Sequence, residues 1–343
     1  MYTFLTPRLF GNRMFQTSVV ILLSFLFVNN ILQSDDAKER LTKAENFYKA
    51  AQFDNAIEIL NQLSTDDAVD EEIQKDALRF LGRAYTAKGL YDDAKTAILK
   101  LLKLEPPMVM FNPDYEPPVF MKLYYESRKE FTGSYEVERP DPGMKTLAVI
   151  DFKNRSIDKK EQYDPMELGF ADLVINRLNN TTTMKVIERE RIKWILDEIK
   201  LQDEHNMEGA VRLGKQLGVQ TVLMGSFIVV KGDIWLGARL VKVETSEILF
   251  SDEIKGDLDD FFELIDELSN KIAAKIDAEL KEDIGEVVPE APSLDAVMSY
   301  SIGLSYLERE DYKNAYAKFQ EALKFDPNYE KAELKAQSIA PLL

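Results

Sequence analysis

Two stretches of the chain repeat apolar residues at the spacing of an amphipathic helix, and turn residues interrupt both of them. In the later stretch a small residue, an aromatic, an alanine, a second aromatic, a second alanine and a proline follow at fixed offsets: Gly303, Tyr306, Ala315, Phe319, Ala322 and Pro327. The earlier stretch has the same offsets at Gly82, Tyr85, Ala94, Ile98, Leu101 and Pro106, and in part at Ala44, Phe47, Ala56, Leu60 and Leu63. Each copy predicts a hairpin of two antiparallel helices.

These offsets resemble those of the tetratricopeptide repeat. A small residue is needed where two helices cross closely, so we expect Gly82 to face Ala94. By the same argument Gly303 faces Ala315. The proline of each copy should end the second helix, because proline cannot donate to the helical hydrogen-bond ladder.

Between the helical stretches the pattern changes to short apolar runs. A run at 146–152 predicts a strand that is buried on both faces, and a second strand follows at 184–187. Helices are expected at 167–178, 190–202 and 207–217, then three strands joined by tight turns at 221–230, 234–242 and 248–255, and a long helix at 258–280. This order predicts a central three-layer α/β domain with a mixed sheet, within an α+β multidomain protein.

Short motifs stand in order along this central region: TLAVIDFKN at 146–154, VIERER at 186–191, LGV at 217–219 with GS at 225–226, and ARLV at 238–241 before ET at 244–245. They resemble the CsgG family of curli assembly proteins, which shares its α/β unit with LpoB-type activators of peptidoglycan synthases and the amino-terminal domain of TolB. The resemblance covers about residues 145–280 and implies assembly with envelope proteins. Channel-forming members carry long membrane-spanning hairpins and an acylated cysteine. This sequence has short hairpins and no cysteine, so an accessory protein is preferred to a secretion pore.

The patterns divide the chain into five parts: 1–34 is a signal peptide or an amino-terminal anchor, 35–131 tetratricopeptide-like helical repeats, 132–144 a linker, 145–284 the CsgG/LpoB-like domain, and 285–343 a carboxy-terminal repeat with a capping helix. The first part has Arg8 and Arg13 but no acidic residue, and then an apolar run at 14–28, which is typical of an export signal. Cleavage of this segment stays open. In both cases the rest of the chain is expected outside the cytoplasm, in the periplasm or cell envelope.

The supply of chemically reactive residues is small. A formal net charge of −17 disfavours binding to nucleic acid. The chain has no cysteine and one histidine, His205, in a polar stretch that predicts a surface loop. The segment 209–215 imitates a phosphate-binding loop, but it lies in an expected helix and is followed by Gln216 in place of serine or threonine. We therefore expect no enzyme activity, no metal and no cofactor.

Charged residues stand where the first two predicted strands end, at Asp151, Glu188 and Arg189. Because α/β sheets place ligands at strand ends, a ligand or interface site is one hypothesis for them. The preferred interpretation is a helix start in which Glu190 suits the helix dipole and the alternating charges pair with one another at the surface.

On the front repeats, the register places Tyr48, Arg79 and Arg83 on the concave face, where the two arginines could pair with a partner's carboxylate. The leading hypothesis is a non-enzymatic envelope adaptor that binds protein or peptide partners. It touches the membrane only through an uncleaved amino-terminal segment, and a homo-oligomer stays open. Two alternatives remain: a small-molecule-binding or hydrolytic α/β domain that uses Asp151 and Glu188, and an oligomeric curli-type secretion channel component.

Overall fold

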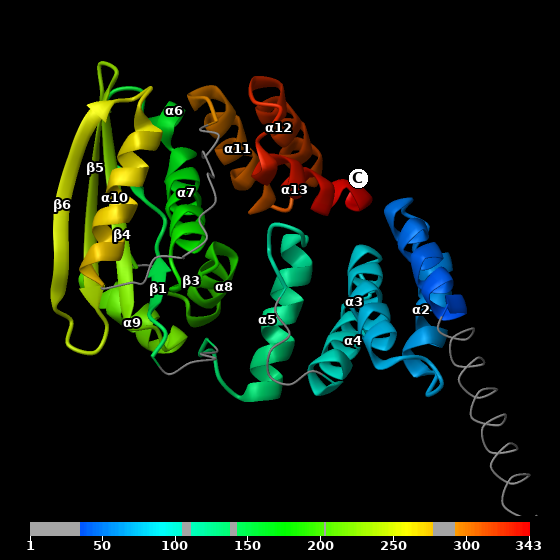
Figure 1. Ribbon diagram of the computed structural model, residues 1–343. Helices are drawn as coiled ribbons and strands as arrows, with labels where there is room; N and C mark the ends of the chain where they lie inside the picture. The colour runs from blue at the N-terminus through cyan, green and yellow to red at the C-terminus, as the bar shows by residue number, and fades with distance from the viewer. Residues whose placement is uncertain (1–34, 105–110, 138–142, 202–203, 277–291) are drawn as a thin grey trace, which may run out of the picture. The chain divides into compact units, whose positions relative to one another are not determined.

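The structure is a computed structural model that describes residues 35–104, 111–137, 143–201, 204–276 and 292–343 (Figure 1). They fall into two compact units, Met1–Leu90 and Tyr91–Leu343. The predicted export signal at 1–34 lies outside the described residues. In the described part of the chain, no helix combines the length and the apolar character that a bilayer crossing requires.

The described part of the first unit is helical. A helix at residues 35–49 is followed by α2 (Phe53–Thr65) and α3 (Glu71–Ala87). Ala56 and Leu60 of α2 are fully buried, as the repeat pattern predicted. α3 begins after Asp70, whose side chain accepts a hydrogen bond from the amide of Glu72 at 3.0 Å and so satisfies a free donor of the first turn.

The second unit is built around a mixed sheet, which confirms the predicted fold class. The strand order is β3-β1-β4-β5-β6, with β1 parallel to β3 and β4, and with β5 antiparallel to β4 and β6. A short β2 pairs with β4. The strands are β1 (Thr146–Val149), β2 (Lys153–Asn154), β3 (Lys185–Ile187), β4 (Thr221–Val230), β5 (Asp233–Lys242) and β6 (Ile248–Asp257).

The first strand is shorter than its apolar run predicted. β1 ends at Val149, and the amide of Phe152 donates to the carbonyl of Glu167 at 3.0 Å. The Phe152 ring then packs over β4 at Gly225, where an added Cβ would lie 2.4 Å from the ring. The chain therefore turns out of the ladder after β1, and Asp151 stands beyond the strand end.

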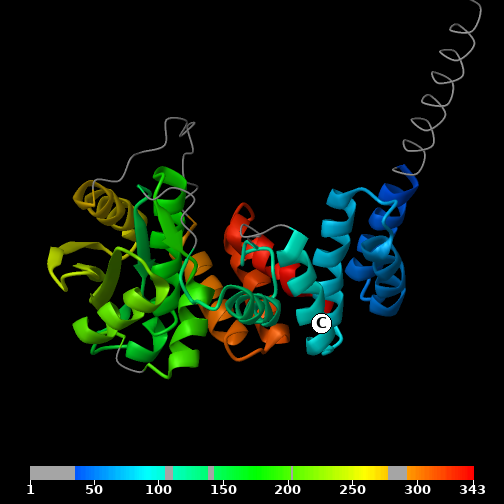
Figure 2. The same cartoon turned by 90° about the horizontal axis from the view of Figure 1, so that it is seen from below.

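Helices cover both faces of the sheet, as the edge-on view in Figure 2 shows. Leu223 and Phe227 of β4 join the core formed with α7 and α10. Val222 faces the other way, because side chains alternate along a strand. It meets α9 at Gly214, where an added Cβ would lie 2.9 Å from the Val222 side chain. The helices of this part of the chain are α6 (Lys160–Tyr163), α7 (Met166–Thr181), α8 (Arg189–Ile199), α9 (Met207–Leu217) and α10 (Phe261–Lys275), of which α7, α9 and α10 contact the strands.

The carboxy-terminal repeat shares its core with the sheet. It consists of α11 (Leu294–Leu307), α12 (Tyr312–Phe325), α13 (Glu330–Ile339) and the short 3-10 helix η1 (Ala340–Leu342). One buried cluster runs from Phe170 of α7 through Tyr300 of α11 to Phe319 of α12. α7 and α11 cross so closely that a Cβ at Gly169 would lie 2.0 Å from the Ser301 Oγ. The repeat is therefore packed as part of this unit.

The second unit also contains α4 (Tyr91–Leu104) and α5 (Pro118–Thr132). α5 packs on α8, with the Tyr125 and Trp194 rings 5.5 Å apart between centroids. After α5, in the predicted linker, the amide of Val137 donates to the carbonyl of Leu217 at 2.9 Å. The domain boundaries drawn from the sequence at residues 131, 144 and 284 stay predictions.

The close contact predicted in the last hairpin has a different partner. The three atoms nearest to a Cβ at Gly303 belong to the Phe319 ring, at 2.5 to 3.1 Å, and not to Ala315. The need for a small residue is therefore set by the aromatic one turn further along α12. Gly82 and Ala94 fall in different units, so that pairing stays a prediction. α12 ends two residues before Pro327, as expected, whereas Pro106 lies outside the described residues.

Candidate functional site

The charged segment after β3 forms the start of α8, as the sequence predicted. Glu188 is the N-cap with an extended backbone, and the helix begins at Arg189. The expected pairing of its charges at the surface is wrong, because Arg189 and Arg191 are each only 5% exposed. α8 packs on α5, and the charges at its start find partners on segments distant in sequence instead of on one another.

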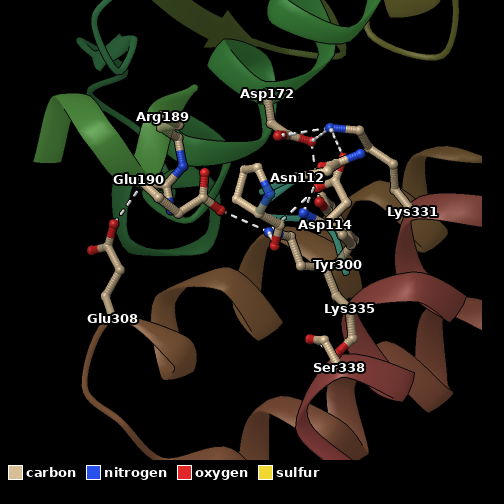
Figure 3. A network of polar contacts seen from close by, with 11 residues as sticks. Asn112, Asp114, Asp172, Arg189, Glu190, Tyr300, Glu308, Lys331, Lys335 and Ser338 are labelled. Carbon is tan, nitrogen blue, oxygen red and sulfur yellow. Dashed lines mark hydrogen bonds and ion pairs between the residues drawn. The ribbon is translucent and has the colours of Figure 1, made fainter. Parts of the chain in front are cut away.

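Arg189 links the end of the sheet to the carboxy-terminal repeat. Its Nη1 donates to Oε1 of Glu308 at 2.6 Å and lies 3.5 Å from Oδ2 of Asp151 (Figure 3 shows the first pair). Burial opposes the guanidinium charge, but Asp151 and Glu308 more than offset it, so the pKa of Arg189 is raised. Burial raises the pKa of Asp151, against the opposing effect of Arg189. Of the three residues predicted at the strand ends, Asp151 and Arg189 are thus brought together. The third, Glu188, is half-buried at the N-cap of α8.

Lys335 of α13 forms the second link to α8. Its Nζ donates to Oε1 of Glu190 at 2.7 Å and to the carbonyl of Pro113 at 3.0 Å, and it lies 3.3 Å from Oδ1 of Asp114. The Lys335 side chain is 3% exposed. Burial disfavours each of these charges, yet Lys335 and Arg189 hold the pKa of Glu190 below its usual range.

Lys331, one helical turn earlier, forms the third link, to α7. Its Nζ is 2.9 Å from both carboxylate oxygens of Asp172, and the Tyr300 hydroxyl donates to the same carboxylate at 3.1 Å. Asp114 is 3.7 Å away from Lys331. Figure 3 shows the two lysines of α13 reaching from one helix toward Asp172, Asp114 and Glu190.

Together these contacts form a buried ionic clamp, which we define as Asp114, Asp172, Arg189, Glu190, Glu308, Lys331 and Lys335. It joins the segment before α5, the helices on the sheet and the carboxy-terminal repeat. Buried ion pairs add little net stability over apolar packing, but they strongly penalise any arrangement that separates the partners. The clamp therefore fixes how these three parts are arranged.

A groove opens beside the clamp, between α5, α8 and α11. Its volume is about 340 Å³. Apolar side chains of α5 and α11 line it, among them Val119, Met121, Leu304 and Leu307. Trp194 of α8 lines it as well, together with the clamp residues Arg189 and Glu308.

His205 occupies a loop, as predicted, but its side chain is half-buried. Its Nε2 lies 3.0 Å from the carbonyl oxygen of Asp151, and its Nδ1 lies 3.3 Å from a carboxylate oxygen of Glu204. Across the described ranges, no three histidine, aspartate or glutamate side chains converge as metal ligands would. The segment 209–215 lies inside α9, and Asn206 caps that helix by accepting from the amide of Gly209 at 2.9 Å.

The residues predicted for the concave face of the front repeats all lie in the first unit. Tyr48 is 7% exposed and packs against Phe53 and Phe80. Arg79 pairs with Asp76 at 2.6 Å, and the Arg83 guanidinium lies 4.8 Å from the centroid of the Phe80 ring. Their role in binding a partner stays a prediction.

Five of the seven clamp residues carried no functional prediction from the sequence: Asp114, Asp172, Glu308, Lys331 and Lys335. A signal was present in α13, where Lys331 and Lys335 are four residues apart and Lys335 stands beside the buried Ala336. A lysine on the apolar stripe of a helix is rarely buried without a carboxylate partner. The sequence does not indicate which carboxylate pairs with Lys335, because Glu190 lies 145 residues earlier in the chain.

The clamp should make the second unit sensitive to acid. Lys331 and Lys335 outweigh the effect of burial and lower the pKa of Asp114, as Lys335 lowers that of Glu190. A carboxylate with a lowered folded-state pKa adds stability above its unfolded pKa, and that stability is lost as the pH falls through the folded value. Asp151 acts in the opposite sense, because its pKa is raised: its contribution is present below the unfolded pKa and is lost as the pH rises.

We therefore expect the urea midpoint of the second unit to fall as the pH drops below about 4, where unfolded Asp and Glu begin to titrate. Tryptophan fluorescence follows this unit selectively, because both tryptophans, Trp194 and Trp235, lie in it. In the Glu190→Gln variant, the urea midpoint should fall less steeply with decreasing pH than in the unchanged protein. If the urea midpoints of the two proteins fall equally with pH, Glu190 does not contribute to the acid sensitivity.

Comparisons with known proteins give matches for the sheet domain and for the repeats. Residues 135–234 match the family described as curli production assembly/transport component CsgG, and residues 77–107 and 296–329 match the tetratricopeptide repeat. No curated protein matches the chain.

Similar solved structures include the LpoB C-terminal domain from Salmonella enterica, at 14% identity over 38% of this chain and 91% of that chain, with a TM-score of 0.25. Lipoprotein GNA1162 from Neisseria meningitidis is 15% identical over 37% of this chain and 96% of that chain, with a TM-score of 0.28. The LpoB C-terminal domain from Escherichia coli is 16% identical over 43% of this chain and 99% of that chain, with a TM-score of 0.27.

Proposed function

Because the chain carries a CsgG-type domain at residues 135–234, with tetratricopeptide repeats before and after it in sequence, we propose that it is a non-enzymatic adaptor of the cell envelope. The two matches confirm the resemblances that the sequence motifs indicated. Tetratricopeptide repeats bind other proteins through exposed helical surfaces, and the matched family is described by its part in assembly and transport.

The observation that carries this proposal is the buried ionic clamp. It commits Arg189 and Glu190 at the start of α8, and Asp172 inside α7, to fixing the carboxy-terminal repeat. Arg189 pairs with Glu308, Glu190 with Lys335 and Asp172 with Lys331. Side chains held in this way position surfaces and are poorly placed to take part in a reaction. The second unit thus supports a rigid docking body better than a catalytic one.

The proposal places the protein outside the cytoplasm, attached to or free within the envelope. Its support is the export-type segment with Arg8 and Arg13 before an apolar run, together with the part in curli assembly and transport that is named for the matched family. A net charge of −17 agrees with contacts to proteins rather than to anionic lipid or nucleic acid.

Affinity capture from the native envelope tests the adaptor function. We expect the tagged full chain to retain a defined partner, and the Arg79→Glu, Arg83→Glu variant to lose any partner that binds the front repeats through a carboxylate. The matched control reverses the charge of two exposed lysines of the same unit, by Lys43→Glu with Lys49→Glu. No specific partner for the unchanged chain would contradict the adaptor function. Equal capture by both variants would remove only the assignment of Arg79 and Arg83.

One observation favours the small-molecule alternative. Among the described residues, the buried Oδ1 of Asp151 and the buried Oε2 of Glu204 have no hydrogen-bond partner. A ligand with hydrogen-bond donors would relieve that cost. A thermal-shift screen that finds a metabolite raising Tm by several degrees, with the shift lost in Asp151→Asn, would replace the adaptor function with this one.

A further inference from the structure

The groove between α5, α8 and α11 is lined at its base by apolar side chains. Val119, Leu304 and Leu307 line it beside Trp194, and its volume of about 340 Å³ suits one or two large side chains rather than a whole domain. Met121 and Leu304 are almost fully buried at its base, each 1% exposed. A groove of this kind gains affinity by receiving an apolar anchor from another molecule.

Two hydrogen-bond donors in the groove lining are unsatisfied. Tyr125 is 3% exposed and Trp194 is 8% exposed, so both are more than nine-tenths buried. In the part of the chain that the structure describes, neither the Tyr125 hydroxyl nor the Trp194 Nε1 has a hydrogen-bond partner. Such donors are costly when left unpaired. Both donor atoms are enclosed by the protein, so an acceptor on a partner would reach them only after the groove lining moves.

The exposed rim of the groove is mainly acidic. Asp197 and Glu310 are exposed there, against one exposed base, Lys122, and the exposed Glu198 is paired with Lys129 at 2.8 Å. Lys193 is half-buried and lies 3.7 Å from Glu308, which also pairs with Arg189; acidic residues still outnumber basic ones in the whole lining. With a net charge of −17 on the whole chain, the field over the groove attracts cations.

We propose that the groove binds a basic segment of a partner protein, one that carries large apolar side chains between lysines or arginines. The apolar side chains enter beside Trp194, and the basic side chains pair with Asp197 and Glu310. This assignment rests on the proposed adaptor function and adds to it the place and the chemistry of one contact.

The emission of Trp194 gives a direct test with the full chain. Trp235 is first changed to phenylalanine, so that Trp194 is the single tryptophan. The probe is a synthetic octapeptide of alternating lysine and leucine, and the comparison peptides replace lysine by glutamate or leucine by serine. We expect a saturable change in emission with the lysine–leucine peptide, and a Kd at least about tenfold higher with either comparison peptide.

Charge reversal on the rim separates groove binding from general attraction. Asp197→Lys with Glu310→Lys should raise the Kd of the basic peptide about tenfold. Glu244→Lys with Glu247→Lys makes the same change in net charge at the exposed β5–β6 turn and should leave the Kd unchanged. All four positions are exposed, so the fold should survive, as circular dichroism can verify.

Equal affinity for the basic and acidic peptides, or equal loss in the two charge-reversal variants, would overturn the groove assignment. A dimer in light scattering that dissociates on Asp197→Lys with Glu310→Lys would also overturn it, by making a second copy of this chain the occupant. If the peptides fail to bind while envelope capture still retains a partner, the adaptor function stands and only the groove is reassigned.

Discussion

Replacement of Lys335 by methionine is expected to lower the free energy of unfolding of the second unit by about 3–5 kcal/mol. The substitution keeps an unbranched, apolar side chain that is one atom shorter, and it removes the cation that lies 2.7 Å from Glu190 and 3.3 Å from Asp114. The half-buried carboxylates of Glu190 and Asp114 then compete for Lys331 and Arg189, or take up protons. Urea unfolding followed by tryptophan fluorescence measures the loss in this unit.

The double variant Lys335→Met, Glu190→Gln provides the internal control. Because it removes the orphaned charge together with its partner, it should recover a large part of the lost stability. Lys313→Met, at an exposed position of α12, should change the free energy of unfolding by less than about 0.5 kcal/mol. A Lys335→Met variant as stable as the Lys313→Met variant would show that the clamp is not ionised in the folded protein.

The second large effect is expected from Gly169→Leu. Gly169 lies where α7 crosses α11, and even a Cβ there would lie 2.0 Å from the Ser301 Oγ and 3.2 Å from the Ser301 Cβ. A branched side chain cannot fit without separating the helices, so the free energy of unfolding should fall by about 3 kcal/mol. The carboxy-terminal repeat should also become a target for limited proteolysis, because α11 is released from its seat on the sheet domain.

Asn180→Leu supplies the comparison for this variant. It places the same side chain at an exposed position of the same helix, α7, and should leave both stability and protease resistance nearly unchanged. Resistance of residues 292–343 to protease in Gly169→Leu would mean that the repeat is held by the clamp alone.

Much of the fold could be predicted, because local patterns determine it. The helix predicted at 207–217, which contains the segment that imitates a phosphate-binding loop, is α9, Met207–Leu217. The strand expected at 221–230 is β4, Thr221–Val230. In both cases the period of the apolar residues and the flanking turn residues agree with the tertiary environment. The first strand was predicted too long, because its apolar run continues into Phe152, whose burial comes from packing on Gly225 and not from the ladder.

The site was less predictable, since its contacts cross the whole unit. The start of α8 after β3 was visible in the sequence, but the burial of Arg189 was not. Its partner Glu308 is 119 residues away. Glu308 stands among other charged residues, a pattern typical of a solvent-exposed turn. Nothing in local spacing distinguishes a charge that will be buried against a distant partner from one that faces water.

The position of α13 in the clamp has a consequence for the order of events during synthesis. Lys331 and Lys335 leave the ribosome after every other described charge of the clamp. Until then Glu190 and Asp172 have no lysine to neutralise them, and the aromatic face of α7 lacks its cover of Tyr300 and Phe319. The ionic contacts of the sheet domain with the carboxy-terminal repeat are therefore completed only after α13 has been synthesised.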